Sequence, residues 1–179
     1  MTYEQLASLA GRAGFTAWAS LDPKTIELKP EVRDMCAANS CGMYGKRWSC
    51  PPGCGTLEAC SRSLNPFSQG ILVQTVGTAE DSFDFEAMQE TENIHKAHFA
   101  HMYGMLKQLS PAVLAMGAGC CTRCAECTYP DSPCRFPGEM TVSMEAYGIL
   151  VHELCRANHL PYYYGPGSIA FTSCFLIGK

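Results

Sequence analysis

The sequence has no excess of positive charge and no long hydrophobic run, and each of these shortages excludes a class of protein. Its 179 residues carry 13 Lys and Arg against 17 Asp and Glu, which gives a net charge of −4. This balance leaves no basic surface for nucleic acid and no polybasic patch for an anionic membrane. No apolar stretch approaches the roughly 18–20 residues of a membrane span. The first residues lack the basic and apolar regions of a signal peptide, so we expect a cytoplasmic protein with no nucleic-acid or membrane partner.

Cysteine, in contrast, is abundant, with twelve residues. Reducing compartments keep thiols free, so a cysteine-rich chain there is expected to bind metal or act in catalysis rather than form disulfides. Since 47% of the residues are apolar, the chain can bury a core without cross-links. Cys155 and Cys174 stand alone in apolar surroundings, and the other ten fall into two groups. The first group is Cys36, Cys41, Cys50, Cys54 and Cys60, and the second is Cys120, Cys121, Cys124, Cys127 and Cys134.

Apolar periodicity predicts strands that alternate with helices along the chain. We therefore expect one α+β (or α/β) domain over residues 1–179, with a mixed β-sheet, flanking helices and two Cys-rich metal-binding loops. The loops are expected at about residues 34–62 and 117–138, and residues 30–55 as a whole are predicted to be irregular. The predicted helices cover residues 3–13, 56–65, 84–109 and 143–159. The predicted strands cover residues 15–21, 70–77, 112–117, 161–165 and 168–178.

The second cysteine group has the spacing of an iron–sulfur site. Cys121, Cys124 and Cys127 follow a C-x2-C-x2-C pattern, and Cys134 comes seven residues later beside Pro133. Successive C-x2-C steps wrap one segment around a cubane cluster, and the fourth thiolate comes from farther along the chain. Three thiolates from one turn would crowd a single zinc ion, although structural zinc is the alternative. Cys120 is predicted to be a bystander at the end of a strand.

The first cysteine group is more widely spaced. Cys36, Cys41 and Cys50 would approach a metal from different parts of an irregular loop, with either Cys54 or Cys60 as the fourth ligand. Glycines in this loop allow close backbone approach. The pattern predicts a metal site without specifying the metal. The aromatic residues Tyr44 and Trp48 would either shield it or simply pack.

These motifs resemble a family of uncharacterised, predicted metal-binding proteins of bacteria and archaea, many of them anaerobes. The resemblance rests on C-x4-C-G-x-Y-G-x2-W-x-C-P-P-x2-G-T-L-E-x-C, on G-A-G-x-C-x2-C-x2-C, and on P-C-R-x-P followed by S-M-E-A-x-G-I. It covers about residues 30–179 and implies cysteine-bound metal, of iron–sulfur type, without a settled activity. The ligands that it implies are Cys36, Cys41, Cys50 and Cys60 in the first group and Cys121, Cys124, Cys127 and Cys134 in the second. The family needs no cysteine at Cys54, so Cys60 is favoured as the fourth ligand of the first site.

Other polar residues are weaker candidates for chemistry. The histidines His95, His98 and His101 repeat every three residues along a predicted helix, where two could share a metal or an anion, although such histidines more often lie on a solvated face. Glu145 follows Ser143, the expected N-cap of a helix, and is expected to favour the helix dipole. Arg135 could offset the negative charge of a thiolate-bound cluster.

Taken together, these patterns predict an iron–sulfur protein with two 4Fe–4S clusters that transfers electrons to or from a redox partner protein. One alternative is a reductase that uses one cluster at a substrate pocket. The others are a structural zinc-binding interaction protein and a protein that delivers a soft metal. The sequence leaves open whether the protein is an enzyme and what its oligomeric state is.

Overall fold

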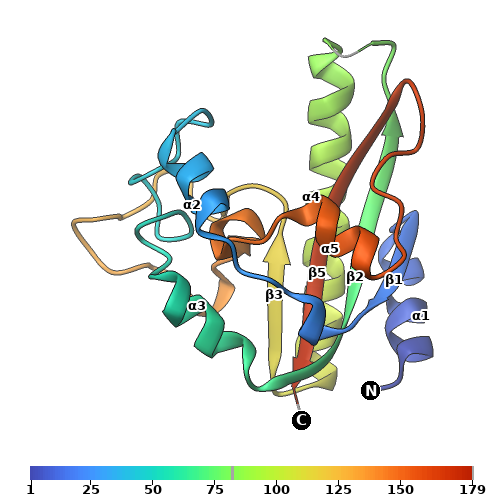
Figure 1. Cartoon of the computed structure of the whole chain (residues 1–179), viewed down its shortest axis with the longest axis horizontal. Helices are drawn as coiled ribbons and strands as arrows, with labels where there is room; N and C mark the ends of the chain where they lie inside the picture. The colour runs from blue at the N-terminus through green and yellow to red at the C-terminus, as the bar shows by residue number, and fades with distance from the viewer. Residues whose placement is uncertain (82, 179) are drawn as a thin grey trace.

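A five-stranded mixed sheet organises the α+β fold in the computed structural model, which describes residues 1–81 and 83–178 (Figure 1). The strand order is β1-β2-β5-β3-β4. All neighbouring pairs are antiparallel except β3 and β4, which run parallel. The strands are β1 (Ala17–Leu21), β2 (Phe67–Thr78), β3 (Val113–Gly117), β4 (Val142–Ser143) and β5 (Ser168–Gly178).

Helices cover both faces of this sheet. The α-helices are α1 (Tyr3–Ala13), α2 (Pro30–Ala37), α3 (Leu57–Leu64), α4 (Phe85–Leu109) and α5 (Val151–Ala157). Three short 3-10 helices are η1 (Pro23–Thr25), η2 (Pro137–Glu139) and η3 (Glu145–Tyr147). Within the described ranges, no helix is both long enough and apolar enough to cross a bilayer. The α+β class and the mixed sheet predicted from the sequence are confirmed.

Alternate residues of the two central strands form the two cores. Ile71 and Phe175 point to the face covered by α1 and α4, where Met102 and Leu106 of α4 are fully buried. Their neighbours on the strands, such as Leu72, point to the opposite face, which α5 and the segment before it cover. Because successive side chains of a strand point to opposite sides, both faces of the central strands are buried, and consecutive apolar residues run from Ile71 to Val73 and from Cys174 to Ile177.

Capping residues mark where the well-predicted helices begin or stop. Asp84 accepts a hydrogen bond from the backbone of Ala87 at 3.0 Å and so caps the 25-residue helix α4. Thr56 caps α3 in the same way through Ala59, at 3.2 Å. Gly14 ends α1 in the left-handed conformation, at φ +105°, which costs glycine little.

Three predicted elements are wrong. The region predicted as irregular contains α2, which begins at Pro30. No single helix runs over 143–159, because Gly148 has φ +88° and separates η3 from α5. A side chain at Gly148 would meet Leu57 at 2.6 Å, so packing against α3 keeps this residue a glycine. Residues 161–165 form a loop and not a strand.

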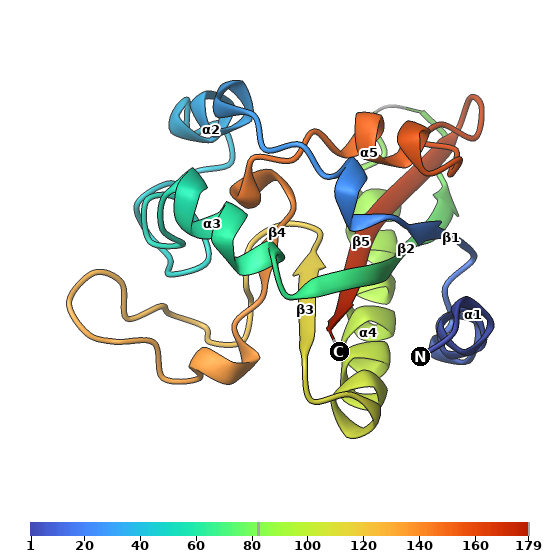
Figure 2. The same ribbon diagram turned by 60° about the horizontal axis from the view of Figure 1, so that its bottom comes forward.

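Both cysteine groups lie beyond the end of the sheet where β3 stops, beside α2 and α3. Figures 1 and 2 show the chain between α2 and α3 lying next to the long excursion between β3 and β4. The fold thus brings two segments together that lie about 70 residues apart in the sequence.

Candidate metal centre

Four thiols of the second cysteine group line one small cavity. They are Cys121, Cys124, Cys127 and Cys134, all in the excursion that follows β3. The cavity is completed by Arg47, Trp48 and Ser49 of the first group's loop, together with Arg123, Phe136 and Met140. The four residues with iron–sulfur spacing therefore share a cavity, and Cys120 does not line it.

The thiols surround this cavity without converging on one point. All twelve cysteines lie in the described part of the chain, and all are free. Among the described residues, no three His, Cys, Asp or Glu side chains lie close enough to hold one metal ion. The open space inside the cavity is about 20 Å³, which is room for one small species. A four-iron cluster would require the surrounding loop to move outward.

Donors and positive charge are directed at these sulfurs. The Trp48 N–H donates to the Cys127 sulfur at 3.5 Å. Burial would raise the pKa of Cys127, but backbone N–H donors from Trp48 and Tyr129 and the charge of Arg47 outweigh it, so the pKa is lowered. Such donors stabilise thiolates, which are the form that binds metal.

Hydrogen bonds tie the loops of the two cysteine groups together. Ser49 Oγ accepts a hydrogen bond from the Cys121 N–H at 3.1 Å, and Arg47 donates to the Cys121 carbonyl at 3.0 Å. The Trp48 indole donates to the Ser132 carbonyl at 3.0 Å and packs edge-on against Tyr129, with ring centroids 4.9 Å apart. Residues 47–49 of the first loop therefore form one wall of the second site.

The first cysteine group is spread over α2, the following loop and α3. Cys36, at the end of α2, and Cys54 point their sulfurs at the neighbouring carbonyls of Glu145 and Ala146, at 4.0 and 3.6 Å. Cys60 lies in α3 with its sulfur 4.0 Å from the Cys54 carbonyl. Cys54 and Cys60, the two candidates for a fourth ligand, are thus neighbours.

Arg33 supplies a cation to these thiols. It donates to the Cys60 sulfur at 3.2 Å and to the Gly55 carbonyl at 3.1 Å. Its Nε is buried and, in the described structure, has no hydrogen-bond partner. Burial raises the pKa of Cys54 and of Cys60, and the charge of Arg33 opposes this effect. A half-buried guanidinium with an unused donor fits an anionic metal–thiolate group.

Of the two remaining members of the first group, Cys50 lies against the second group. Cys41 is exposed, whereas Cys50 is buried and hydrogen-bonded to Cys120. This bond lowers the pKa of Cys120 and raises that of Cys50, because one thiol donates to the other. Sequence reasoning treated Cys120 as a bystander and missed this contact, for which a single sequence carries no signal.

Among the other predicted candidates, His95 and His98 both hydrogen-bond to Thr75 Oγ1, at 3.0 and 3.2 Å. His95 is buried, His98 is half-buried and His101 is exposed. Ser143 does accept a hydrogen bond from the Ala146 N–H at 3.1 Å, but the turn it caps is η3 and not a long helix. Glu145 lies in the first turn of η3, and its expected role at a helix start stays a prediction. Arg135 is exposed and donates to the Glu126 carbonyl at 2.9 Å within the second loop.

Comparison with known proteins gives one match. The model of a family described as predicted metal-binding protein (DUF2284) matches residues 19–177. No curated protein and no solved structure matches the chain. The matched range contains both cysteine groups and, of the five described strands, β2, β3 and β4 in full.

Proposed function

Because the chain belongs to the predicted metal-binding protein family DUF2284, we propose that its two cysteine groups hold iron–sulfur clusters and that it transfers electrons to or from a redox partner protein. Bound clusters of this kind accept and release single electrons. The observation that carries the proposal is the single cavity lined by Cys121, Cys124, Cys127 and Cys134. These are the four thiols whose spacing is typical of a 4Fe–4S site.

The surroundings of the second cysteine group support a bound cluster. Thiolates spread around a cavity suit a group with several metal atoms, each of which takes one sulfur. The N–H of Trp48 and the cation of Arg47 would offset the negative charge of such a group and raise its reduction potential. Trp48, Tyr129 and Phe136 provide aromatic cover.

The loop that carries these thiols can open to admit a cluster. Most residues from Thr122 to Phe136 are exposed or only partly buried. Few hydrogen bonds hold the loop, among them those from Trp48 to Ser132 and from Thr128 to the Pro133 carbonyl at 2.9 Å. Local openings of such segments require little free energy.

For the first set, we propose Cys36, Cys41 and Cys50 as ligands with Cys60 or Cys54 as the fourth. The unused donor of Arg33 supports an anionic group beside Cys54 and Cys60. Zinc at one or both sets is a second candidate, because the 20 Å³ of open space at the second set fits one ion better than a cluster.

Anaerobic metal and sulfide analysis separates these candidates. Two 4Fe–4S clusters predict about eight iron and eight acid-labile sulfide per chain, with visible absorption that bleaches on reduction. Cys124→Ala should remove at least about half of the iron and sulfide. Cys155→Ala, a buried core thiol outside both groups, is the matched control and should keep all of it. A colourless protein with stoichiometric zinc would overturn the proposal.

The fourth ligand of the first set requires its own comparison. The family pattern predicts that Cys60→Ala loses the metal of the first set and that Cys54→Ala keeps it. Loss of this metal in Cys54→Ala, with retention in Cys60→Ala, would identify Cys54 as the fourth ligand. Cys120→Ala tests whether the hydrogen-bonded neighbour of Cys50 is a ligand, and we expect the metal content to be unchanged.

A further inference from the structure

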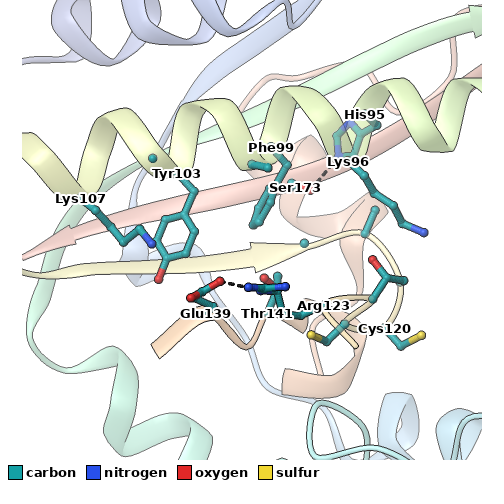
Figure 3. A pocket seen from close by; sticks show the side chains of 17 residues that line it. His95, Lys96, Phe99, Tyr103, Lys107, Cys120, Arg123, Glu139, Thr141 and Ser173 are labelled. Atoms are coloured by element: carbon teal, nitrogen blue, oxygen red, sulfur yellow. Dashed lines mark hydrogen bonds and ion pairs between the residues drawn. The ribbon is translucent and has the colours of Figure 1, made fainter. Parts of the chain in front are cut away.

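A second cavity, next to the second cysteine group, lies between α4 and the start of the loop that follows β3. Its volume is about 300 Å³, the lower end of the range for small-molecule sites. Figure 3 shows Phe99, Tyr103 and Lys107 of α4 on one wall and Arg123, Glu139 and Thr141 on the other. The hydrogen-bonded pair of His95 and Ser173, 2.7 Å apart, forms the inner end.

One wall of the cavity is aromatic and fixed in place. The ring of Phe99 stacks on Phe175 of β5 with centroids 4.9 Å apart, and Tyr103 lies 6.2 Å from Phe99. Burial raises the pKa of Tyr103, so its hydroxyl keeps its proton and can donate. These two rings, tilted by 42° to each other, offer an apolar surface with a hydrogen-bond donor at its edge.

Gly104 keeps this cavity open. It lies inside α4, where a glycine destabilises a helix by about 1 kcal/mol relative to alanine. A Cβ built at Gly104 meets no atom within 4 Å, and the residue lines the cavity. Packing therefore does not require a glycine here, whereas space for a ligand would.

The lining carries excess positive charge in an otherwise acidic chain. Lys96, Lys107 and Arg123 face one carboxylate, Glu139, although the chain has a net charge of −4. Lys96 pairs with Glu92 at 2.6 Å, and Arg123 pairs with Glu139 at 2.7 Å.

Lys107 differs from these two cations. Its Nζ lies 4.5 Å from the centre of the Tyr103 ring, with no carboxylate within 4 Å among the described residues. Its charge is available to a ligand.

We propose that this cavity binds a small aromatic carboxylate. The ring lies against Phe99 and Tyr103 in the space above Gly104, and the carboxylate meets Lys107 and the Tyr103 hydroxyl. Cys120 and Cys121 line the same cavity, so the ligand would lie beside the thiols, as the reductase alternative requires. The site stands on its own residues and does not depend on which metal the thiols hold.

Fluorine NMR titration with para-fluorobenzoate tests the site on the protein as purified, with its metal content measured in the same sample. The matched probe is para-fluorobenzyl alcohol, which has the same ring without the charge. We expect the carboxylate to bind at least about tenfold more tightly than the alcohol, because a charge-assisted contact is roughly twice as strong as a neutral one. Equal affinity of the two probes, or no binding of the carboxylate at about 10 mM, a concentration that detects even a very weak site, overturns the proposal.

Three variants locate the binding. Gly104→Leu fills the cavity and should abolish binding, while thermal unfolding is unchanged or raised because leucine favours the helix. Lys107→Gln should weaken the binding of para-fluorobenzoate about tenfold and leave the binding of para-fluorobenzyl alcohol unchanged. Lys24→Gln, on η1 and outside the cavity lining, is the control and should bind like the parent.

Two further outcomes complete the test. Retained parental binding in both Gly104→Leu and Lys107→Gln would refute this site. Retained binding in Cys124→Ala would show that the carboxylate site and the metal site are separate, so that the failure of one proposal leaves the other standing.

Discussion

Replacing His95 by glutamine should remove a large part of the pH dependence of stability. His95 is 1% exposed in the core between α4 and the sheet. Its two ring nitrogens lie 3.0 Å from Thr75 Oγ1 and 2.7 Å from Ser173 Oγ. Burial, with smaller effects from the charges of His98 and Lys96, lowers the pKa of His95 to about 4. The native protein therefore holds this imidazole neutral.

The sign and size of the effect follow from the two pKa values. An unfolded chain protonates this histidine below about pH 6.5, whereas the folded protein does so only below about pH 4. Between these values the unfolded state binds more protons, so the free energy of unfolding falls as the pH falls. The full difference is about 3 kcal/mol, a sizeable part of the 5–15 kcal/mol of a typical domain.

The glutamine variant should be less stable near pH 7.5 and as stable as the parent, or more so, below about pH 5. At neutral pH the substitution loses ring contacts and some hydrogen-bond quality, about 1–2 kcal/mol. At lower pH the parent loses stability through His95 and the variant does not, so the two curves should cross near pH 5.5.

Urea unfolding followed by tryptophan fluorescence at pH 4.5, 5.5, 6.5 and 7.5 measures this crossing. Metal loss and carboxylate titration affect both proteins, so the difference between the two curves isolates His95. His101→Gln, on the exposed side of α4, is the control and should follow the parent. A constant gap between parent and His95→Gln across the pH range would refute the reasoning.

Two further predictions concern a helix end and a cation. Gly14→Ala should lower the free energy of unfolding by about 1–3 kcal/mol, because this residue has a left-handed conformation and a Cβ there would meet His98 at 2.5 Å. The matched variant Gly104→Ala, whose Cβ would lie in open space, should raise the free energy of unfolding by up to about 1 kcal/mol. Similar shifts of the melting temperature in the two variants would contradict this prediction. Arg33→Met should weaken the metal at the first set about 10–100-fold in a chelator competition, since it removes the charge beside Cys60. Arg33→Lys should recover part of that loss, and unchanged chelator resistance in Arg33→Met would contradict the role of the cation.

The predictable parts of the fold are those with a strong local pattern. Helix α4 lies within the predicted range 84–109 and extends over about seven turns of apolar spacing. β2 and β5 each carry a consecutive apolar run, Ile71 to Val73 and Cys174 to Ile177, because both faces of the sheet are covered. Helix α2 was missed, although the Pro at its first position is a signal for a helix start. The apolar periodicity of its eight residues is too weak to indicate a helix among the surrounding cysteines and glycines.

Tertiary packing determines the parts of the fold that the sequence pattern did not predict. The pattern from Ser143 onward has helical spacing, but Gly148 is held at positive φ against Leu57, more than 90 residues earlier. No local reading of the sequence contains that contact. The same limit applies to the cysteines: the spacing of Cys121, Cys124, Cys127 and Cys134 indicated four thiols that line one cavity, but it carried no information on the contact between Cys50 and Cys120.

The contacts between the groups change what a ligand variant can report. Spacing alone treats the sites as independent, with one retained when the other is lost. In the structure, Ser49 and Arg47 of the first loop bind the backbone of Cys121, and Cys50 lies against Cys120. Ordering either loop around a metal therefore orders a wall of the other site, because the wall and the first ligands share one backbone segment. Metal at the two cysteine groups should therefore bind with positive coupling.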